Sequence, residues 1–454
     1  MKKTLLFIVV QLLIFNGFAQ DWDAVGGGTN GSIKAMIEYE GDLIVGGYFT
    51  EAGGQEAACV ARWDGSQWHP MGNGFAGEVL DFEIYGGWLY ASGWFFSDPN
   101  YTQEYEGIAR WTGSAWSPVI DYDPVSWGGE IYDMLVFNNE LYITNHSIIG
   151  SEGVSRVSKF NGATWTDLPG AYTHSGNQGQ IYTLEIYNDQ LIAGGLFDEV
   201  DGNAVKNVAR FNGSNWESLN MFSNGLYDKV YKLLVYNNDL YAGGIFFDPF
   251  YTTLQKYDGS NWSIYQMNID VNLWDIQDLM IYDDELFVSG VFYYEEGPNN
   301  ISACSVLKET EDTYRWLDLS FFNSNSTQWI GFAMCAYNGD LYLGGDFQYA
   351  GSQDDPKNNI ARFNGQIPTT IQEFQESENA TIFPNPASNL IYFNEDFSDN
   401  QNLIVQVYDL SGRLVLEHKL EQNWLNIYDL NNGLYQIKVS GGQNEYRGRF
   451  IKAD

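Results

Sequence analysis

One pattern recurs seven times along the 454-residue chain and constrains the fold more than any other feature. Each copy has an aromatic residue, a short turn, a leucine four positions after the aromatic residue, and a second apolar segment that often contains Gly-Gly. Repeats of about 20 to 50 residues are typical of solenoids and propellers. We call the recurring leucines the anchor leucines; they are Leu43, Leu89, Leu141, Leu191, Leu240, Leu286 and Leu341.

A second motif follows in every copy, although it is degenerate in the sixth. In the first copy it reads Arg62-Trp63-Asp64-Gly65-Ser66-Gln67-Trp68. Short hydrophobic segments that flank Asp-Gly or Asn-Gly are typical of antiparallel hairpins. Each copy therefore predicts four strands, which is the content of one propeller blade.

The seventh copy ends at Gly365 without its second tryptophan, and the missing piece lies at the other end of the chain. Residues Trp22 to Gly28 match Trp68 to Gly74 of the first copy. We expect this head segment to supply the outer strand of the last sheet, because such pairing removes an open sheet edge. The fold class predicted for residues 20–366 is an all-β, seven-bladed β-propeller closed by the N-terminal strand.

The repeat resembles the kelch and galactose-oxidase central-domain type of propeller, in which a glycine pair ends the second strand. The pairs here are Gly46-Gly47, Gly194-Gly195, Gly243-Gly244 and Gly344-Gly345, whereas the third copy has Thr144-Asn145. The resemblance implies an architecture and not an activity, since kelch-like propellers serve many functions. The Tyr, Cys and His set of a radical-copper oxidase is not recognisable.

A different β pattern follows a predicted linker at residues 367–379. Residues 380–454 contain short alternating strands, which predict an immunoglobulin-like β-sandwich. This segment is similar to the type A sorting domain of the type IX secretion system of Bacteroidota, through Val407 to Arg413, Leu430 to Tyr435 and Phe450 to Lys452. The resemblance implies contact with the type IX secretion machinery, removal of the tail, and a protein that is released or held at the cell surface.

The N-terminus has the pattern of a signal peptide. Lys2 and Lys3 precede an apolar stretch from Leu5 to Phe18, and Ala19 is a suitable cleavage residue. We expect residues 1–19 to be removed and the protein to be secreted or placed on the outer cell surface. No later apolar run is long enough for a membrane span.

Charge and cysteine content exclude some classes of partner. The formal net charge of −37 disfavours nucleic acid, whose phosphates attract basic surfaces. The three cysteines predict buried thiols rather than a disulfide framework, with a Cys59–Cys304 bridge as the alternative. No cofactor is expected, and calcium is the alternative left open.

Two sets of residues are predicted to bind a ligand on the face that carries the longer loops. One set is aromatic, because exposed rings stack on sugars or anchor protein partners; it comprises Trp94, Tyr101, Trp127, Tyr251 and Trp274. The other lies eight positions before an anchor leucine, in the first strand of a copy, and comprises Asp81, Asp133, Lys232 and Asp278. Packing against neighbouring loops and lining of a water-filled channel are the structural alternatives.

No catalytic constellation is recognisable in the sequence. The four histidines lie in three different copies and the tail, without metal-ligand spacing. The leading hypothesis is a non-enzymatic extracellular protein that binds a glycan or a protein. The alternatives are a carbohydrate-active hydrolase or lyase with carboxylates at the channel mouth and a structural adhesion protein.

Overall fold

The computed structural model consists of β-strands and connecting loops in all of its described residues. Two compact units divide the chain, Met1–Gly365 and Gln366–Asp454, close to the predicted boundary. The structure describes residues 22–119, 129–147, 154–221, 228–246, 252–264, 271–294, 303–310, 313–320, 330–347, 357–363, 378–379, 382–383, 387–393, 403–408, 414–420, 424–428, 430, 433–441 and 444–452. The predicted signal peptide lies outside them.

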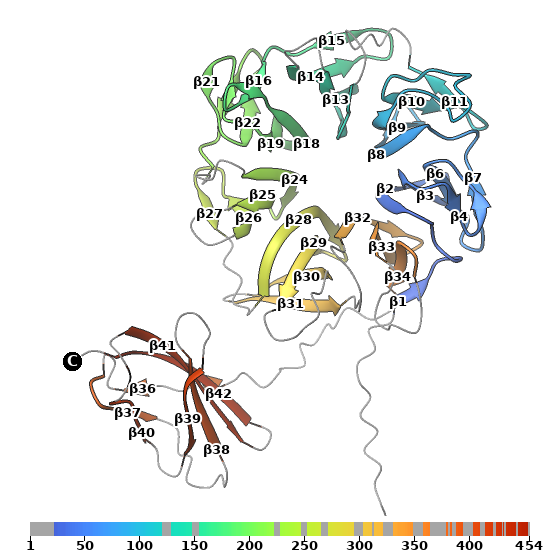
Figure 1. The fold of residues 1–454 in the computed structure, drawn as a ribbon. Helices are drawn as coiled ribbons and strands as arrows, with labels where there is room; N and C mark the ends of the chain where they lie inside the picture. The colour runs from blue at the N-terminus through green and yellow to red at the C-terminus, as the bar shows by residue number, and fades with distance from the viewer. Residues whose placement is uncertain are drawn as a thin grey trace, which may run out of the picture. The chain divides into compact units, whose positions relative to one another are not determined.

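Among its described residues, the first unit contains six sheets of four strands and one sheet of eight, and they are arranged around a ring (Figure 1). From the inner to the outer strand, the first sheet is β2 (Ser32–Tyr39), β3 (Asp42–Tyr48), β6 (Val60–Trp63) and β7 (Trp68–Pro70). The second is β8 (Gly77–Tyr85), β9 (Trp88–Phe95), β10 (Ile108–Trp111) and β11 (Trp116–Pro118). The fourth is β18 (Gln180–Tyr187), β19 (Gln190–Leu196), β22 (Val208–Phe211) and β23 (Trp216–Ser218).

The fifth sheet is β24 (Lys229–Tyr236), β25 (Asp239–Phe246), β26 (Thr252–Tyr257) and β27 (Trp262–Ile264). The sixth is β28 (Val271–Tyr282), β29 (Glu285–Tyr294), β30 (Ala303–Thr310) and β31 (Thr313–Ser320). The seventh is β32 (Ile330–Tyr337), β33 (Asp340–Asp346), β34 (Ile360–Phe363) and β1 (Trp22–Ala24). Strands β4 (Glu51–Ala52) and β5 (Gln55–Glu56) form a small hairpin in the loop between β3 and β6.

The third sheet is larger than the repeat predicts. Its repeat strands are β12 (Met134–Phe137), β13 (Glu140–Ser147), β14 (Val154–Phe160) and β15 (Trp165–Asp167). It also includes β16 (Tyr172–His174), β17 (Asn177–Gln178), β20 (Glu199–Val200) and β21 (Asn203–Ala204). These extra strands come from the connections into and within the fourth copy, so they tie the third and fourth copies together.

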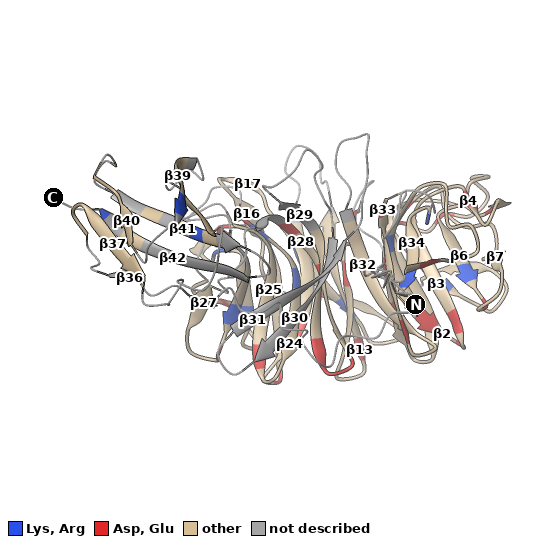
Figure 2. Cartoon of the chain, turned by 90° about the horizontal axis from the view of Figure 1, so that it is seen from below, with Lys and Arg blue, Asp and Glu red and all other residues tan. Residues whose placement is uncertain are grey.

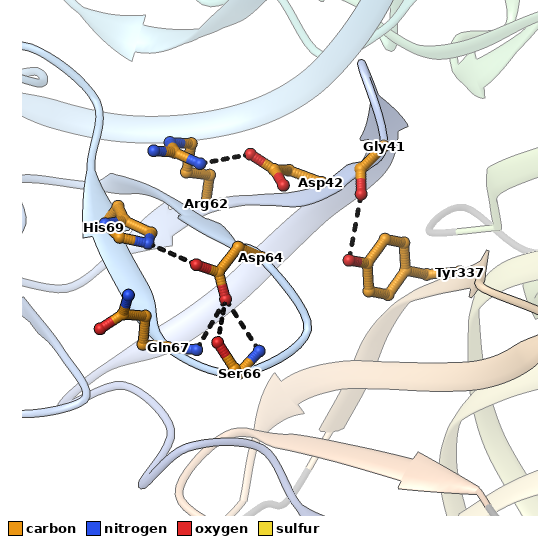
Figure 3. Close-up of polar contacts among 8 residues, drawn as sticks. All are labelled: Gly41, Asp42, Arg62, Asp64, Ser66, Gln67, His69 and Tyr337. Carbon is orange, nitrogen blue, oxygen red and sulfur yellow. Dashed lines mark hydrogen bonds and ion pairs between the residues drawn. The ribbon is translucent and has the colours of Figure 1, made fainter.

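The N-terminal strand completes the last sheet, as predicted. Strand β1 pairs antiparallel with β34, with Trp22 opposite Phe363 and Ala24 opposite Ala361. Trp22 is only 4% exposed and its ring centroid lies 5.3 Å from that of Phe363. The last and first sheets also touch at the inner end, because the Tyr337 hydroxyl donates a 3.1 Å hydrogen bond to the carbonyl oxygen of Gly41 (Figure 3).

Two repeated hydrogen bonds join neighbouring sheets and explain why the motif residues recur. The tyrosine four positions before an anchor leucine donates its hydroxyl proton to a turn carbonyl of the next sheet; the bonds are Tyr39–Gly87, Tyr85–Asn139, Tyr236–Asp284, Tyr282–Gly339 and Tyr337–Gly41. The outer-strand tryptophan donates its indole N–H to a carbonyl of the preceding copy; these bonds are Trp68–Val25, Trp116–Met71, Trp216–Pro169 and Trp262–Leu219.

The glycine pair has two separate steric reasons. A Cβ on Gly46 would lie 2.5 Å from Cγ1 of Val79, so the first glycine permits close approach of the next sheet. A Cβ on Gly47 would collide with the carbonyl oxygen of Ser32 in the same sheet. That carbonyl lies next to a β-bulge, which strands β2, β8, β18, β24, β28 and β32 all contain at the equivalent place.

The turn after β6 is stabilised by its aspartate. The Asp64 carboxylate accepts hydrogen bonds from the backbone N–H groups of Ser66 and Gln67, both at 2.8 Å, and contacts His69 Nε2 at 2.7 Å (Figure 3). These bonds, led by that to His69, lower the pKa of Asp64 well below its usual value. Gly65 has a φ of 92°, which L side chains rarely adopt, so the Asp-Gly pair suits this turn.

The second motif of each copy begins with a basic residue, such as Arg62 before Trp63. Where this basic residue is described, its side chain makes contacts within its own sheet. The cation pairs with an acid on a neighbouring strand in Arg62–Asp42 (2.5 Å), Lys159–Glu140 (2.8 Å), Lys256–Asp239 (2.6 Å), Arg210–Glu217 (2.8 Å) and Arg362–Asp23 (2.5 Å). Arg110 faces a tryptophan instead and stacks over Trp88, 4.9 Å from the ring centroid.

The anchor leucines lie in the core between sheets. Leu43, Leu89, Leu141, Leu240 and Leu341 are fully buried, and the phenylalanines six positions later, such as Phe95, are buried with them. Cys59 and Cys335 are buried free thiols, so the alternative of a Cys59–Cys304 disulfide was wrong.

The second unit contains two sheets around one core. The larger sheet consists of β35 (Glu378–Asn379), β42 (Asn444–Lys452), β41 (Gly433–Gly441), β38 (Leu403–Tyr408) and β39 (Leu414–Leu420); the smaller consists of β36 (Ile382–Phe383), β37 (Leu390–Phe393) and β40 (Trp424–Asn426). Ile391 and Leu425 from the smaller sheet share a core with Val405, Ile437 and Phe450. Strand β35 lies within the predicted linker 367–379 and pairs with β42, so the linker prediction was wrong for these two residues.

Candidate functional site

The residues eight positions before the anchor leucines lie just after the bulge in six inner strands and directly before β12 in the third sheet, and we call them the lock row. They are Ala35, Asp81, Asp133, Thr183, Lys232, Asp278 and Ala333. Four of them accept a hydrogen bond from a backbone N–H of the next inner strand: Asp81 from Met134 (2.7 Å), Asp133 from Leu184 (2.5 Å), Thr183 from Leu233 (3.2 Å) and Asp278 from Met334 (2.8 Å). An inner strand has no partner strand on its axial edge, so these side chains satisfy amides that lack a ladder partner.

Lys232 is the exception in the lock row, because an ammonium group cannot accept a hydrogen bond from the next strand. Its Nζ lies 3.9 Å from Oδ1 of Asp278, and that same oxygen accepts the 2.9 Å hydrogen bond from the backbone N–H of Leu279. The Asp278 carboxylate therefore accepts hydrogen bonds from one backbone N–H of its own strand, that of Leu279, and one of the next inner strand, that of Met334. Burial alone would lower the pKa of Lys232, but the negative charges of Asp133, Asp278 and Asp81 outweigh it and raise that pKa.

Burial is the main cause of the raised pKa values of the acidic side chains in the inner strands. It raises the pKa of Asp133 to about 6 and the pKa of Glu83 to about 7, and it raises the pKa of Asp81 well above the usual value. Strongly shifted carboxyl groups often mark functional sites, but structural networks shift them too. The hydrogen bonds to backbone amides give the predicted residues Asp81, Asp133 and Asp278 a structural role, and ligand binding by them stays a prediction.

A second row in the same strands was not predicted and is the more accessible to a ligand. The residue nine positions before each anchor leucine is the extra residue of the bulge, or its equivalent in the third sheet, and has no ladder partner. We call this set the bulge row; it consists of Lys34, Leu80, Tyr132, Tyr182, Tyr231, Gln277 and Phe332, all half-buried. The repeat register contained the signal, since this row is adjacent to the lock row.

Side chains of the bulge row meet their counterparts from neighbouring sheets. The ring centroids of Tyr132 and Tyr182 are 5.0 Å apart in an edge-to-face arrangement, and those of Tyr182 and Tyr231 are 5.2 Å apart. In the adjoining part of the ring, Nζ of Lys34 lies 2.9 Å from the ring centroid of Phe332. Because each contact joins two sheets, the row forms arcs around the inner side of the ring.

A third row lies two residues closer to the long loops. The residues eleven positions before the anchor leucines form this rim row; in the first six sheets they are Ser32, Glu78, Glu130, Gln180, Lys229 and Asp275. The Tyr132 hydroxyl donates to the Glu130 carboxylate and the Tyr182 hydroxyl to the Gln180 amide oxygen. Burial raises the pKa of Asp275 to about 7 and that of Glu78 above its usual value, while it lowers the pKa of Lys34 to about 8.

Two of the five predicted loop aromatics have described side chains, and both are exposed. Trp94, at the long-loop end of β9, is 53% exposed, and Tyr101 is 82% exposed. The Asp98 carboxylate fixes the Tyr101 loop by accepting bonds from the Thr102 N–H (2.6 Å), the Thr102 hydroxyl (2.7 Å) and the Gln103 N–H (3.1 Å). Trp127 and Tyr251 lie outside the described residues, as does the side chain of Trp274, whose backbone belongs to β28.

Charge separates the two ends of the inner ring. Acidic residues gather at the short turns, where Figure 2 shows them along the lower edge near β2, β13 and β24. Examples are Glu40, Asp42, Glu140, Asp239, Asp283 and Asp340. The rim and bulge rows at the other end hold three carboxylates, Glu78, Glu130 and Asp275, against the two ammonium groups of Lys34 and Lys229. These two rows are therefore closer to electrical balance than the whole chain.

Ser155 and His146 form a serine–histidine pair of the kind that can activate a nucleophile. Nδ1 of His146 lies 2.9 Å from Oγ of Ser155. Ser155 is fully buried, however, and its hydroxyl donates to the carbonyl oxygen of Gly179. A hydroxyl without access to substrate cannot act as a nucleophile, so this contact joins β13, β14 and the segment before β18.

Within the described part of the chain, no group of three or more His, Cys, Asp or Glu side chains is arranged to hold a metal ion. The same part of the chain contains no helix with the length and apolar character of a membrane span.

Comparison with known proteins defines the tail. Residues 381–453 match the family described as the secretion system C-terminal sorting domain. The predicted type IX sorting domain is therefore confirmed, and it indicates export to the cell surface or secretion through contact with the type IX machinery. No curated protein matches the chain.

Among solved structures, the chain is similar to the extracellular domains of two proteins from B. thetaiotaomicron. The first belongs to a putative hybrid two-component system, with 12% identity and a TM-score of 0.49 over 95% of this chain and 57% of that one. The second belongs to a putative one-component system, with 12% identity and a TM-score of 0.47 over 96% and 58%. The chain thus spans little more than half of these proteins.

A GH32 β-fructofuranosidase from Bombyx mori, determined as a mutant with sucrose, is more distant. Its identity is 10% and its TM-score 0.26, over 93% of this chain and 89% of that one. At TM-scores below 0.5, none of these similarities defines a function for this chain.

Proposed function

We propose that this chain is an exported, non-enzymatic binding protein, with a kelch-like, seven-bladed β-propeller that recognises an extracellular glycan or protein through its long-loop face. Residues 1–19 direct it across the inner membrane, and the C-terminal tail, an immunoglobulin-like sandwich, directs it across the outer membrane. The mature protein is then released or attached to the cell surface.

The observation that carries the proposal is the pair of exposed aromatic side chains in β9 and in the connection between β9 and β10. Trp94 and Tyr101 expose 53% and 82% of their surface, which is unusual for rings of this size. Both are held on ordered backbone, Trp94 by β9 and Tyr101 by the Asp98 loop. Rigid exposed rings lose little conformational entropy on binding and are therefore efficient contact residues.

The carboxylates of the lock row favour binding over catalysis. An acid or base in a glycoside hydrolase must reach the glycosidic oxygen or a water molecule. Asp81, Asp133 and Asp278 each accept a backbone N–H of the next strand instead. We propose no cofactor, and chelation of calcium should leave binding unchanged.

A matched pair of tryptophans tests the proposal. Trp94 and Trp88 lie at opposite ends of β9 and expose 53% and 43% of their surface, but only Trp94 lies at the long-loop end. Binding of the mature full chain to a glycan array and to outer-surface proteins should fall on Trp94→Ala or Tyr101→Ala and persist on Trp88→Ala. Equal binding by all three variants would refute the proposed face.

A further inference from the structure

We infer that the rim and bulge rows form an axial site for one neutral sugar residue of a glycan chain, and this inference rests on the proposed binding function. The first step concerns access. Every β-bulge in the inner strands presents one residue without a ladder partner, and the seven residues of the bulge row all stay half-buried rather than buried. The core between sheets does not enclose them, so part of each side chain is available for contact.

The second step concerns shape and apolar contact. Tyr132, Tyr182 and Tyr231 form one continuous arc of rings from three neighbouring sheets, with centroids 5.0 and 5.2 Å apart. Aromatic rings offer an apolar body and a polar tip, which suits the C–H faces and hydroxyl groups of a sugar. Leu80 and Phe332 add apolar surface in the remaining part of the same row.

The third step concerns polar contacts. The rim row places carboxylates, an amide and an ammonium group beside the aromatic arc, so both donors and acceptors are available there. Tyr132 and Tyr182 are oriented by Glu130 and Gln180, which still retain further hydrogen-bonding capacity. A polyhydroxylated ligand both donates and accepts, and it matches such a mixed set better than a ligand of one polarity.

The fourth step concerns charge and selects the class of glycan. Glu78, Glu130 and Asp275 face Lys34 and Lys229, so the two rows nearly balance in a protein of formal net charge −37. An acidic sugar would meet the excess of carboxylates, and a basic sugar would meet only a small net negative charge to offset the loss of its own hydration. A neutral sugar meets neither penalty. The exposed Trp94 lies opposite Glu78 in the second sheet, and Tyr101 lies in the connection between β9 and β10. These two aromatic residues would bind the adjoining part of the same glycan.

The test uses the mature full chain and isothermal titration calorimetry with neutral gluco-, manno- and xylo-oligosaccharides, with oligogalacturonate and chitosan oligomers as acidic and basic probes. We expect a neutral oligosaccharide to bind, Tyr182→Ala to weaken binding about tenfold through loss of a stacked ring, and Trp88→Ala to leave it unchanged. Leu80→Trp adds bulk to the same row and should also weaken binding; it keeps the test valid if Tyr182→Ala fails to fold.

The outcomes separate the axial site from the wider function. Binding of neutral oligosaccharide that depends on Trp94 but is insensitive to Tyr182→Ala and Leu80→Trp overturns the axial site and keeps the proposed function. Tighter binding of an acidic or basic oligosaccharide overturns the neutral class. Binding of a protein partner alone, lost on Trp94→Ala, overturns the sugar site and keeps the binding function. Absence of any glycan or protein binding overturns both.

Discussion

Replacement of Trp22 by alanine tests whether the head strand closes the last sheet as firmly as a continuous chain would. Trp22 is 4% exposed and packs against Phe363, and its strand forms three residue pairs with β34. Truncation of a buried tryptophan removes its burial energy and leaves a cavity, and it costs ~3–5 kcal/mol. Trp116 holds the equivalent place in the second sheet, where β11 follows β10 through a short turn and cannot separate from it.

We therefore expect Trp22→Ala and Trp116→Ala to lower the free energy of unfolding of the first unit by similar amounts. Asp23→Ala should cost under about 1 kcal/mol, because the ion pair of Asp23 with Arg362 is about 40% exposed on both sides. Urea titration of the mature full chain, followed by tryptophan fluorescence and by circular dichroism, measures the three costs.

A loss below about 1 kcal/mol for Trp22→Ala, beside a loss of several kcal/mol for Trp116→Ala, would refute this reasoning. It would mean that the head strand is separated from β34 for much of the time, and that the ring is closed by the inner strands alone.

Three further predictions follow from the repeated contacts. Tyr337→Phe removes the hydroxyl that bonds to Gly41 and should cost ~1 kcal/mol in the urea assay; an unchanged midpoint would deny that this bond joins the first and seventh sheets. Gly46→Ala places a Cβ 2.5 Å from Val79 and should cost ~1–3 kcal/mol through overpacking, and a neutral result would show that the two sheets are not in close contact. Burial raises the pKa of Glu83 and Asp275 to about 7 and that of Asp133 to about 6, all above their unfolded values, so folding strengthens proton binding. The stability that these groups contribute is fully present below their unfolded pKa values and is lost as pH rises through about 6 to 7. The urea midpoint should therefore be higher at pH 5 than at pH 8, and this difference should be smaller in Glu83→Gln. A midpoint that rises steadily with pH would contradict this.

Much of the architecture could be predicted from the sequence because each copy makes the same packing contacts and hydrogen bonds with its neighbours. Leu43 and its counterparts fill the same space between sheets, and Trp68 and Trp116 make the same bond to the preceding copy. The match of Trp22 to Trp68 then predicted the closing strand, because residues at equivalent positions of the repeat form equivalent strand pairs. The eight-stranded third sheet was not readable, since its extra strands come from connections that have no counterpart in the other copies.

The candidate site was less readable, and the reason is the β-bulge. Strict alternation along an inner strand assigns each residue to one of two faces. An extra residue at the bulge interrupts that alternation, and so Tyr182 and Tyr231 came to lie side by side on the axial edge. The sequence predicts charged side chains at Asp81, Asp133 and Asp278, but it does not predict their hydrogen-bond partners. These partners are backbone amides of a neighbouring sheet, about 50 residues away in sequence.

The amino-acid sequence by itself determined the strands of the repeat, the seven copies, the pairing of head and tail copies and the secretion tail, because these depend on local patterns and their spacing. Only the tertiary structure decided which inner side chains lock neighbouring sheets and which face the axis. That choice depends on where two strands from different copies approach each other, and no single copy contains the information.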